Sequence, residues 1–91
     1  MTPADTDELF EERAAIAEHD GGLSRARAEA LAAEERMRCE VRYVCAKGAD
    51  AETYLAQVAQ RRGQLAADEL RRQAREQYRR GNRGRRGEWY E

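Results

Sequence analysis

Arginine is the residue type in this chain with the clearest chemistry, and it gathers near the C-terminus. Residues 71–86 contain eight arginines and one acid, Glu76. A guanidinium group presents several N–H donors in a planar fork that matches phosphate and carboxylate groups. The aromatic residues that follow can stack on unpaired bases. The pattern predicts a site for a protein partner or a nucleic acid, made of Arg71, Arg72, Arg75, Arg79, Arg80, Arg83, Arg85, Arg86, Trp89 and Tyr90.

The same arginines have a plainer alternative interpretation, namely a solvated end that keeps the protein in solution. Glu88 and Glu91 dilute the positive charge where the aromatic residues occur. The two interpretations differ in one measurable respect. Binding to nucleic acid weakens steeply as salt is added, because phosphate contacts release counterions.

Acidic side chains gather at the other end of the chain. The first 20 residues contain seven acids and a single base, Arg13. Such a helix suits a basic nucleic-acid channel on another protein or this protein's own arginines, and a solvated helix face is the alternative. The imbalance extends further, because residues 1–60 carry 7 basic and 13 acidic side chains whereas residues 61–91 carry 10 and 5. A net charge of −1 therefore conceals a bipolar chain.

Side chains that commonly perform catalysis show no recognisable pattern. His19 falls at the C-terminal end of an expected helix, where the helix dipole favours an imidazolium. The spacing of Cys39 and Cys45 matches no zinc site, and on one helix they lie about 9 Å apart along its axis, so reduced thiols are expected. Glutamates such as Glu34 and Glu40 are interpreted as surface salt-bridge partners. The sequence predicts no enzyme, no metal and no cofactor.

Helices are the elements expected to position the charged groups, because the chain has 17 alanines and a single proline. Thr2 and Ser24 are expected N-caps, and Asp50 is expected to cap a third helix. Glycines 21, 22, 48 and 63 mark helix ends. The predicted helices are 3–20, with a start at residue 6 as the alternative, 24–47, 50–62 and 64–80.

Each predicted helix carries a narrow apolar side. That side is Leu9, Phe10, Ile16 and Ala17 in the first helix, with Arg13 at the same spacing; Ala26, Ala30, Ala33, Met37, Val41 and Val44 in the second; Tyr54, Leu55, Val58 and Ala59 in the third; and Ala66, Ala67, Leu70, Ala74 and Tyr78 in the fourth.

One segment of the second helix is ambiguous. Residues 39–45 alternate apolar and charged side chains, which is the pattern of a strand. A helix is favoured, because a lone strand has no partner elsewhere in the chain.

These elements predict an all-α protein, a compact bundle of about four short helices with a flexible basic tail. Residues 1–80 form the expected helical domain, and residues 81–91 form a flexible Arg/Gly tail too polar to fold alone. Alanine stripes bury little area, so we expect either a homodimer or a monomer that becomes fully ordered on its target. No apolar run is long enough for a membrane span or a signal peptide, so a cytoplasmic location is expected.

Three stretches together resemble a known group of proteins: residues 10–32, 39–44 and 59–78. They are similar to small Ala- and Arg-rich proteins of phages and integrative mobile elements of GC-rich proteobacteria, a group that is mostly uncharacterised and includes anti-CRISPR-type accessory proteins. The resemblance implies a non-enzymatic protein that acts on host machinery by stoichiometric binding. It assigns no binding residue.

Charge pattern and resemblance together give two functional expectations. The first is a phage or mobile-element protein that binds and inhibits a host nucleic-acid-processing defence complex, such as a CRISPR effector, through charged helix faces. The alternative is an accessory protein that binds DNA or RNA directly, single strands in particular, with its C-terminal arginine-rich helix and tail.

Overall fold

Helix covers most of the chain, and the all-α class is confirmed. The computed structural model describes all 91 residues. Its elements are α1 (Pro3–Asp20), α2 (Arg25–Lys47), a single 3-10 turn η1 (Gly48–Asp50), α3 (Ala51–Arg62) and α4 (Gln64–Arg79). Residues 39–45 lie inside α2, so the helical interpretation of that segment is correct. α2 has 23 residues, in agreement with the helix predicted over residues 24–47, so the description of the bundle as short helices is wrong for this element.

The helix ends follow local chemistry at most positions. Thr2 caps α1 and exchanges hydrogen bonds with Asp5 in a capping box, and the Ser24 side chain accepts from the backbone of Arg27. The predicted Asp50 cap is wrong, because η1 joins α2 to α3 and the Asp50 backbone is already helical, with φ −72° and ψ −9°. Only Gly63, at φ 98°, separates α3 from α4.

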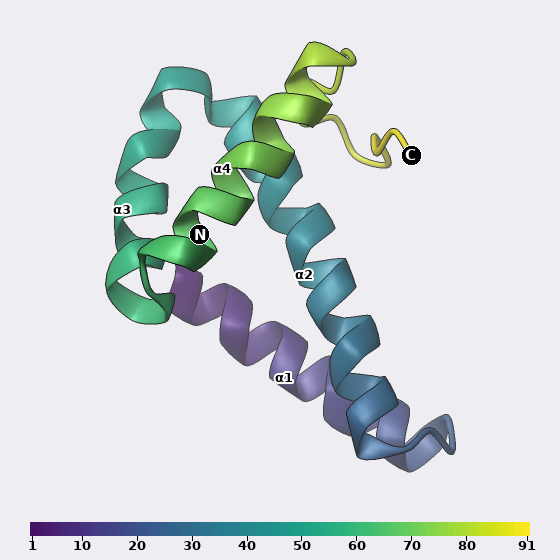
Figure 1. Cartoon of the computed structure of the whole chain (residues 1–91). Helices are drawn as coiled ribbons and strands as arrows, with labels where there is room; N and C mark the ends of the chain where they lie inside the picture. The colour runs from purple at the N-terminus through teal and green to yellow at the C-terminus, as the bar shows by residue number, and fades with distance from the viewer.

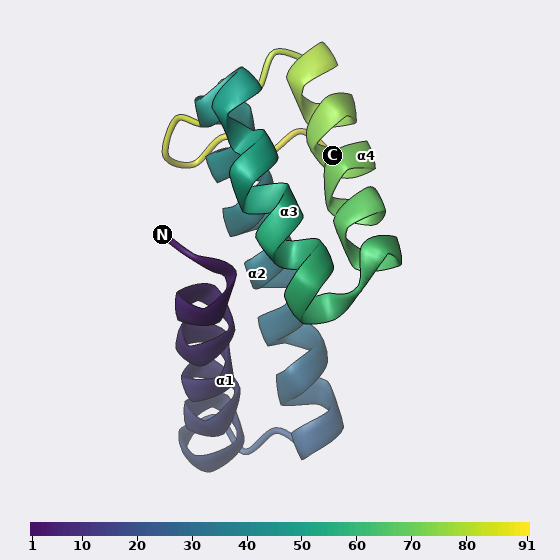
Figure 2. The same cartoon turned by 90° about the vertical axis from the view of Figure 1, so that its left-hand side faces the viewer.

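The helices are arranged in two packed groups that share α2 (Figures 1 and 2). The first half of α2 lies against α1, and this pair has a small core of Phe10, Ala14, Ala28 and Ala32. The second half of α2 packs with α3 and α4 around a larger core. The long axis of the molecule measures 40 Å, with cross dimensions of 28 and 20 Å.

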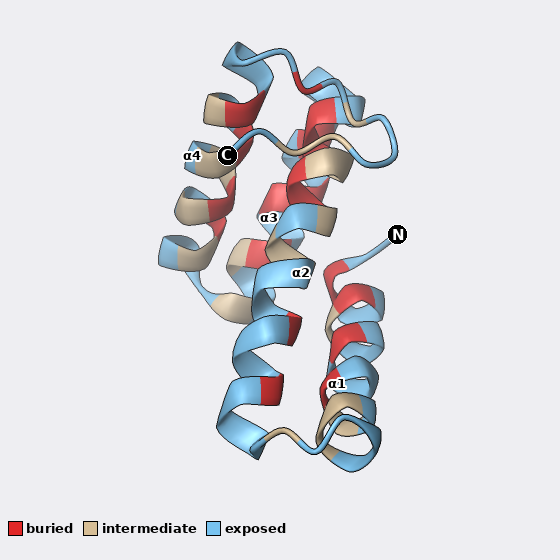
Figure 3. Cartoon of the chain, turned by 90° about the vertical axis from the view of Figure 1, so that its right-hand side faces the viewer, coloured by how far each residue is buried: buried red, intermediate tan, exposed pale blue.

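The apolar sides of the helices are only partly those predicted. Buried positions of α1 and α2 face one another (Figure 3), and in the first half of α2 they are Ala28 and Ala32 rather than Ala26 and Ala30. The position of α1 decides which alanines are covered. Val41 and Val44 are buried as predicted, whereas Ile16 of α1 is exposed.

The prediction of a flexible tail at residues 81–91 is wrong, because the segment folds back over α2 and α4. The Gln77 side-chain amide donates to the carbonyl of Tyr90 at 2.6 Å and accepts from its N–H at 2.8 Å. Asn82 is fully buried and its Oδ1 accepts from the N–H of Gly84 at 2.9 Å. Trp89 packs against the larger core. Hydrogen bonds of polar side chains thus hold in place a segment that buries little apolar area.

None of the helices combines the length and the apolar character needed to cross a membrane.

Candidate nucleic-acid interface

Most of the arginines predicted to form a binding face on α4 are paired within the chain. Arg71 forms a bidentate ion pair with Glu52 of α3. Arg72 holds Glu69 with hydrogen bonds of 3.0 and 2.7 Å, and these bonds, with one from Gln73, lower the pKa of Glu69 to about 2. Residues 71–80 therefore do not form a free basic face.

Glu76 holds the next two arginines of the predicted site. Arg79 and Arg80 both form ion pairs with its carboxylate. Burial alone would raise the pKa of Glu76, but the arginine contacts outweigh burial and lower it. Arg75 is the one arginine of α4 that takes part in no ion pair.

The predicted site residues after α4 divide into free and engaged groups. Arg85 and Arg86 are exposed and have no carboxylate partner. Arg83 donates to the carbonyl of Tyr78 at 2.6 Å, and its guanidinium lies 3.8 Å from the centre of the Tyr78 ring. Trp89 is half-buried, and Tyr90 is held through its backbone by α4.

Cations without a carboxylate partner collect where α2 and α4 end, at the top of Figure 1. The segment after α4 passes directly against α2 here, because Gly84 lies beside Ala46 and the carbonyl of Arg42. Lys47, which follows on α2, lies 5.5 Å above the Tyr43 ring. We call this region the cationic end and define it by Arg42, Lys47, Arg75, Arg83, Arg85 and Arg86.

Two members of the cationic end, Arg42 and Lys47, were missed by sequence reasoning. They lie 29 and 24 residues before Arg71, where the arginine cluster begins, on a helix interpreted only as part of the core. No local pattern marks them. The packing of Gly84 on α2 brings the two segments together, and a contact of that kind is a tertiary event.

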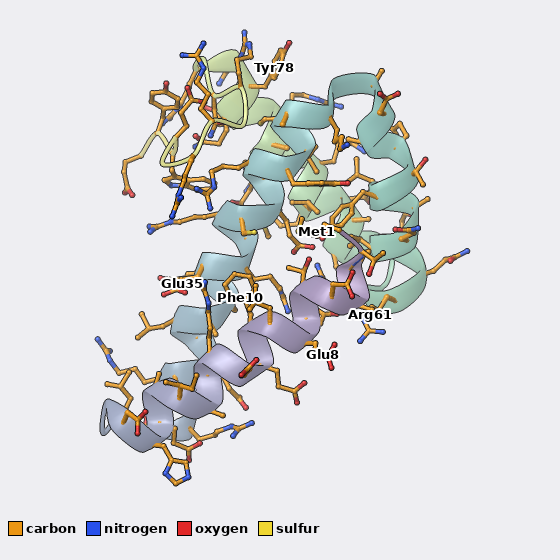
Figure 4. The ribbon with its side chains drawn as sticks, turned by 180° about the vertical axis from the view of Figure 1, so that it is seen from behind. Met1, Glu8, Phe10, Glu35, Arg61 and Tyr78 are labelled. Atoms are coloured by element: carbon orange, nitrogen blue, oxygen red, sulfur yellow. The ribbon has the colours of Figure 1, made fainter.

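Acidic side chains occupy the opposite part of the molecule, on α1. Asp5, Glu8, Glu11 and Glu12 are exposed and form no ion pair. Glu8 projects away from the helix bundle in Figure 4. The charge separation along the sequence is therefore also a separation in space.

A second charged cluster is buried where α1, α2 and α3 meet, and we call it the buried network. Glu40 has only 1% of its side chain exposed, so its interpretation as a surface salt-bridge partner is wrong. Its carboxylate accepts two hydrogen bonds from Arg62, at 2.8 and 3.0 Å, and one from the Tyr54 hydroxyl. The Thr6 hydroxyl lies 3.1 Å from the Tyr54 hydroxyl, and Asp7 completes the set.

Asp7 ties α1 to the other helices through this network. Arg62 and Arg61 of α3 and Arg36 of α2 all reach its carboxylate, at 2.8, 2.6 and 3.2 Å. Figure 4 shows Arg61 beside the start of α1. Burial alone would raise the pKa of Asp7, but the hydrogen bonds from Arg61 and Arg62 outweigh it and hold the pKa below 3.8. These ion pairs hold α1 against α2 and α3.

Tyr54 and Arg62 of the buried network also have shifted pKa values. Burial, together with the hydrogen bond to Glu40, raises the pKa of Tyr54 above its usual value of 10.0. Burial opposes the charge of Arg62, yet the bonds to Glu40 and Asp7 raise its pKa overall. No buried side-chain polar atom lacks a hydrogen-bond partner.

The remaining candidates for chemistry are dispersed. Cys45 is buried and donates to the carbonyl of Ala74 at 3.4 Å, and burial raises the pKa of its thiol. Cys39 is a second free thiol. No three His, Cys, Asp or Glu side chains are grouped so that they could hold a metal ion.

The fold and its surface define a class: a small all-α protein with most of its unpaired cations at one end and unpaired carboxylates on α1. No family model, no curated protein and no solved structure matches the chain.

Proposed function

We propose that this protein is a non-enzymatic binding protein whose cationic end holds the phosphate backbone of a nucleic acid. The observation that supports it is the gathering of six unpaired cations from α2, α4 and the segment after α4. Elsewhere the arginines are held by carboxylates of the chain, apart from Arg27 near the start of α2, so the unpaired cations are concentrated in this group. Guanidinium groups suit phosphate oxygens because they bind them through two donors at once.

The arrangement fits a polyanion better than a single small anion. The six side chains come from three segments and have no enclosed pocket between them. Contacts spread in this way neutralise several phosphates along a strand and release counterions with each one. Positive charge here also speeds the encounter with a polyanion, since the carboxylates of α1 lie at a distance.

The test compares two triple variants with the same change in charge. In the first, Arg75, Arg85 and Arg86 become alanine, which removes three unpaired cations. In the second, Arg71, Arg72 and Arg79 become alanine, which removes three cations already held by Glu52, Glu69 and Glu76. Fluorescence anisotropy with a labelled oligonucleotide gives each affinity.

We expect the unpaired triple to lose at least about tenfold in affinity, because each lost phosphate contact lowers binding. The paired triple should lose clearly less. Equal losses would mean that only net charge matters, and a wild type that binds no oligonucleotide would refute the function.

A second candidate is the inhibition of a host nucleic-acid-processing complex, such as a CRISPR effector, and the surface of α1 favours it. Exposed, unpaired carboxylates along that helix resemble a polyanion and suit a basic channel. In this case Glu8, Glu11 and Glu12, changed together to glutamine, should abolish capture of the complex from nuclease-treated lysate. The cationic-end triple should leave that capture unchanged.

A further inference from the structure

A groove next to the cationic end has the features of a binding site for a base. It lies between α1, the middle of α2 and the returning segment after α4, and its volume is about 440 Å³. Phe10 and Glu35, which are labelled in Figure 4, mark the place where α1 faces α2 in this groove. Grooves of a few hundred Å³ are of the size that holds small organic groups.

The charge of the groove is positive. Three arginines line it, Arg13, Arg38 and Arg42, against two glutamates, Glu35 and Glu88. Arg42 belongs to the cationic end and has no ion pair, so the groove and that end form one continuous surface. Glu35 is engaged by Arg13 at 3.1 Å, and Glu88 accepts from the backbone N–H of Arg83 at 2.7 Å.

The pairing of Arg38 is weak enough for a ligand to replace it. Its carboxylate partner, Glu91, is 3.4 Å away and has 84% of its side chain exposed. Exposed ion pairs of this kind contribute little free energy. A phosphodiester carries one negative charge, as Glu91 does, but in a bound strand the neighbouring contacts hold it beside Arg38 at high effective concentration, so it would displace Glu91 from Arg38.

The apolar lining of the groove suits a flat ring. Leu9 and Phe10 of α1, Cys39 of α2 and Trp89 contribute to it. Trp89 is half-buried against the core, which fixes its ring, and the Arg38 guanidinium lies 5.7 Å from the ring centre. A fixed aromatic ring beside arginines is the usual means of holding an unpaired base together with its phosphate.

We propose that this groove holds one unpaired nucleotide of a single-stranded nucleic acid, with its base against Trp89 and its phosphate on Arg38 and Arg42. The inference rests on the proposed function, since the backbone on either side of that nucleotide continues over the cationic end. It adds a preference for single strands over duplex, because a paired base is not available to the groove.

Trp89 is the only tryptophan of the chain, so its fluorescence reports directly on the groove. The experiment titrates the full-length protein with an oligothymidylate of about 12 nucleotides and with a duplex of the same length. We expect the single strand to quench the fluorescence and to bind at least about fivefold more tightly than the duplex.

Four single variants complete the experiment. Arg38→Ala should weaken single-strand binding about fivefold and leave duplex binding unchanged, because Arg38 lies outside the cationic end. Glu91→Gln should strengthen single-strand binding, since it frees Arg38, whereas Asp20→Asn, which removes the same charge at the far end of α1, should not. Arg27→Ala is the matched control for Arg38, because Arg27 is exposed and unpaired near the start of α2.

The results distinguish a wrong groove assignment from a wrong proposed function. If the single strand binds without quenching and Arg38→Ala changes nothing, the groove assignment is overturned. The function would still stand if the variant lacking Arg75, Arg85 and Arg86 loses affinity. If neither oligonucleotide binds the wild type, both proposals are overturned.

Discussion

At the scale of single residues, Glu40 shows how a small protein keeps a charge in its interior. Its carboxylate has 1% exposure and is matched by a bidentate Arg62 and by the Tyr54 hydroxyl. Arg62 and Tyr54 come from α3, and Arg36 of α2 lies 3.7 Å from the same carboxylate, while Asp7 and Thr6 attach α1 to the cluster. Removing two charges together can be tolerated, but removing one partner leaves the other buried and uncompensated.

Arg62→Met should therefore be strongly destabilising. We expect a loss of about 3 kcal/mol or more in the free energy of unfolding, because Glu40 would stay buried with only Arg36, at 3.7 Å, as its remaining cation. Urea denaturation measures it. Arg61→Met is the matched control, since Arg61 also pairs with Asp7 but is half exposed, and it should cost under about 1 kcal/mol. Similar losses in both variants would contradict this account of the network.

Asp7 gives the stability a dependence on pH. Its pKa in the folded protein is held below 3.8, so the folded state binds fewer protons than the unfolded chain in acid. The stabilisation is present above the unfolded value and is lost as the pH falls through the folded one. Denaturation midpoints between about pH 6 and about pH 3 should fall less steeply in Asp7→Asn than in the wild type. Parallel profiles would show that Asp7 contributes nothing.

At the scale of elements, the segment after α4 depends on a close approach at Gly84. A Cβ atom at this position would lie 2.5 Å from the carbonyl oxygen of Arg42 and 2.4 Å from the Cβ of Ala46. The backbone is also left-handed, with φ 84°. Glycine is required here for both reasons.

Gly84→Ala should detach this segment from α2. Its control is Gly87→Ala, which has a similar φ of 88° but nothing within 4 Å of the added atom. Both variants carry the strain of a left-handed alanine, roughly 1 kcal/mol, and only Gly84→Ala adds a backbone clash. We expect red-shifted Trp89 emission and faster proteolysis of the segment in Gly84→Ala alone. The same response in both variants would mean that the left-handed φ, and not the contact of Gly84 with α2, causes the effect.

Local chemistry predicted much of the helical framework, and tertiary contacts decided the rest. Thr2, Ser24 and Gly63 act where the sequence places them, because caps and helix ends depend on neighbouring residues. The error at residues 81–91 has a physical cause. Composition counts apolar residues, whereas this segment is held by the buried side chains of Gln77 and Asn82, whose partners no pattern indicates.

The sequence indicates which residue type forms the candidate site, but not which individual residues belong to it. Eight arginines near the C-terminus indicate a charged end. Which of them remain free depends on where carboxylates lie in space. The ion pair of Arg71 with Glu52 on α3 illustrates this, because 19 residues separate the two along the chain. Arg42 enters the site only through packing.

At the scale of the whole molecule, charge and core size set the behaviour. Much of the buried apolar set is alanine, and Leu9, Ile16 and Leu65 remain exposed. The expectation of a homodimer, or of further ordering on a target, stays a prediction. Melting curves over a hundredfold range of protein concentration should show a rising midpoint for a homodimer. An invariant, high midpoint would contradict both forms of the expectation.

The measurement that tests the central claim most directly is the salt dependence of oligonucleotide binding. Six cations without a carboxylate partner, all engaging phosphates, predict a slope of log K against log salt of about −5 on duplex DNA. Alanine at Arg75, Arg85 and Arg86 should reduce that slope by about 3, whereas alanine at Arg71, Arg72 and Arg79 should leave it nearly unchanged. A flat salt dependence in the wild type, or equal changes in the two triples, would show that the unpaired cations do not form a polyanion site.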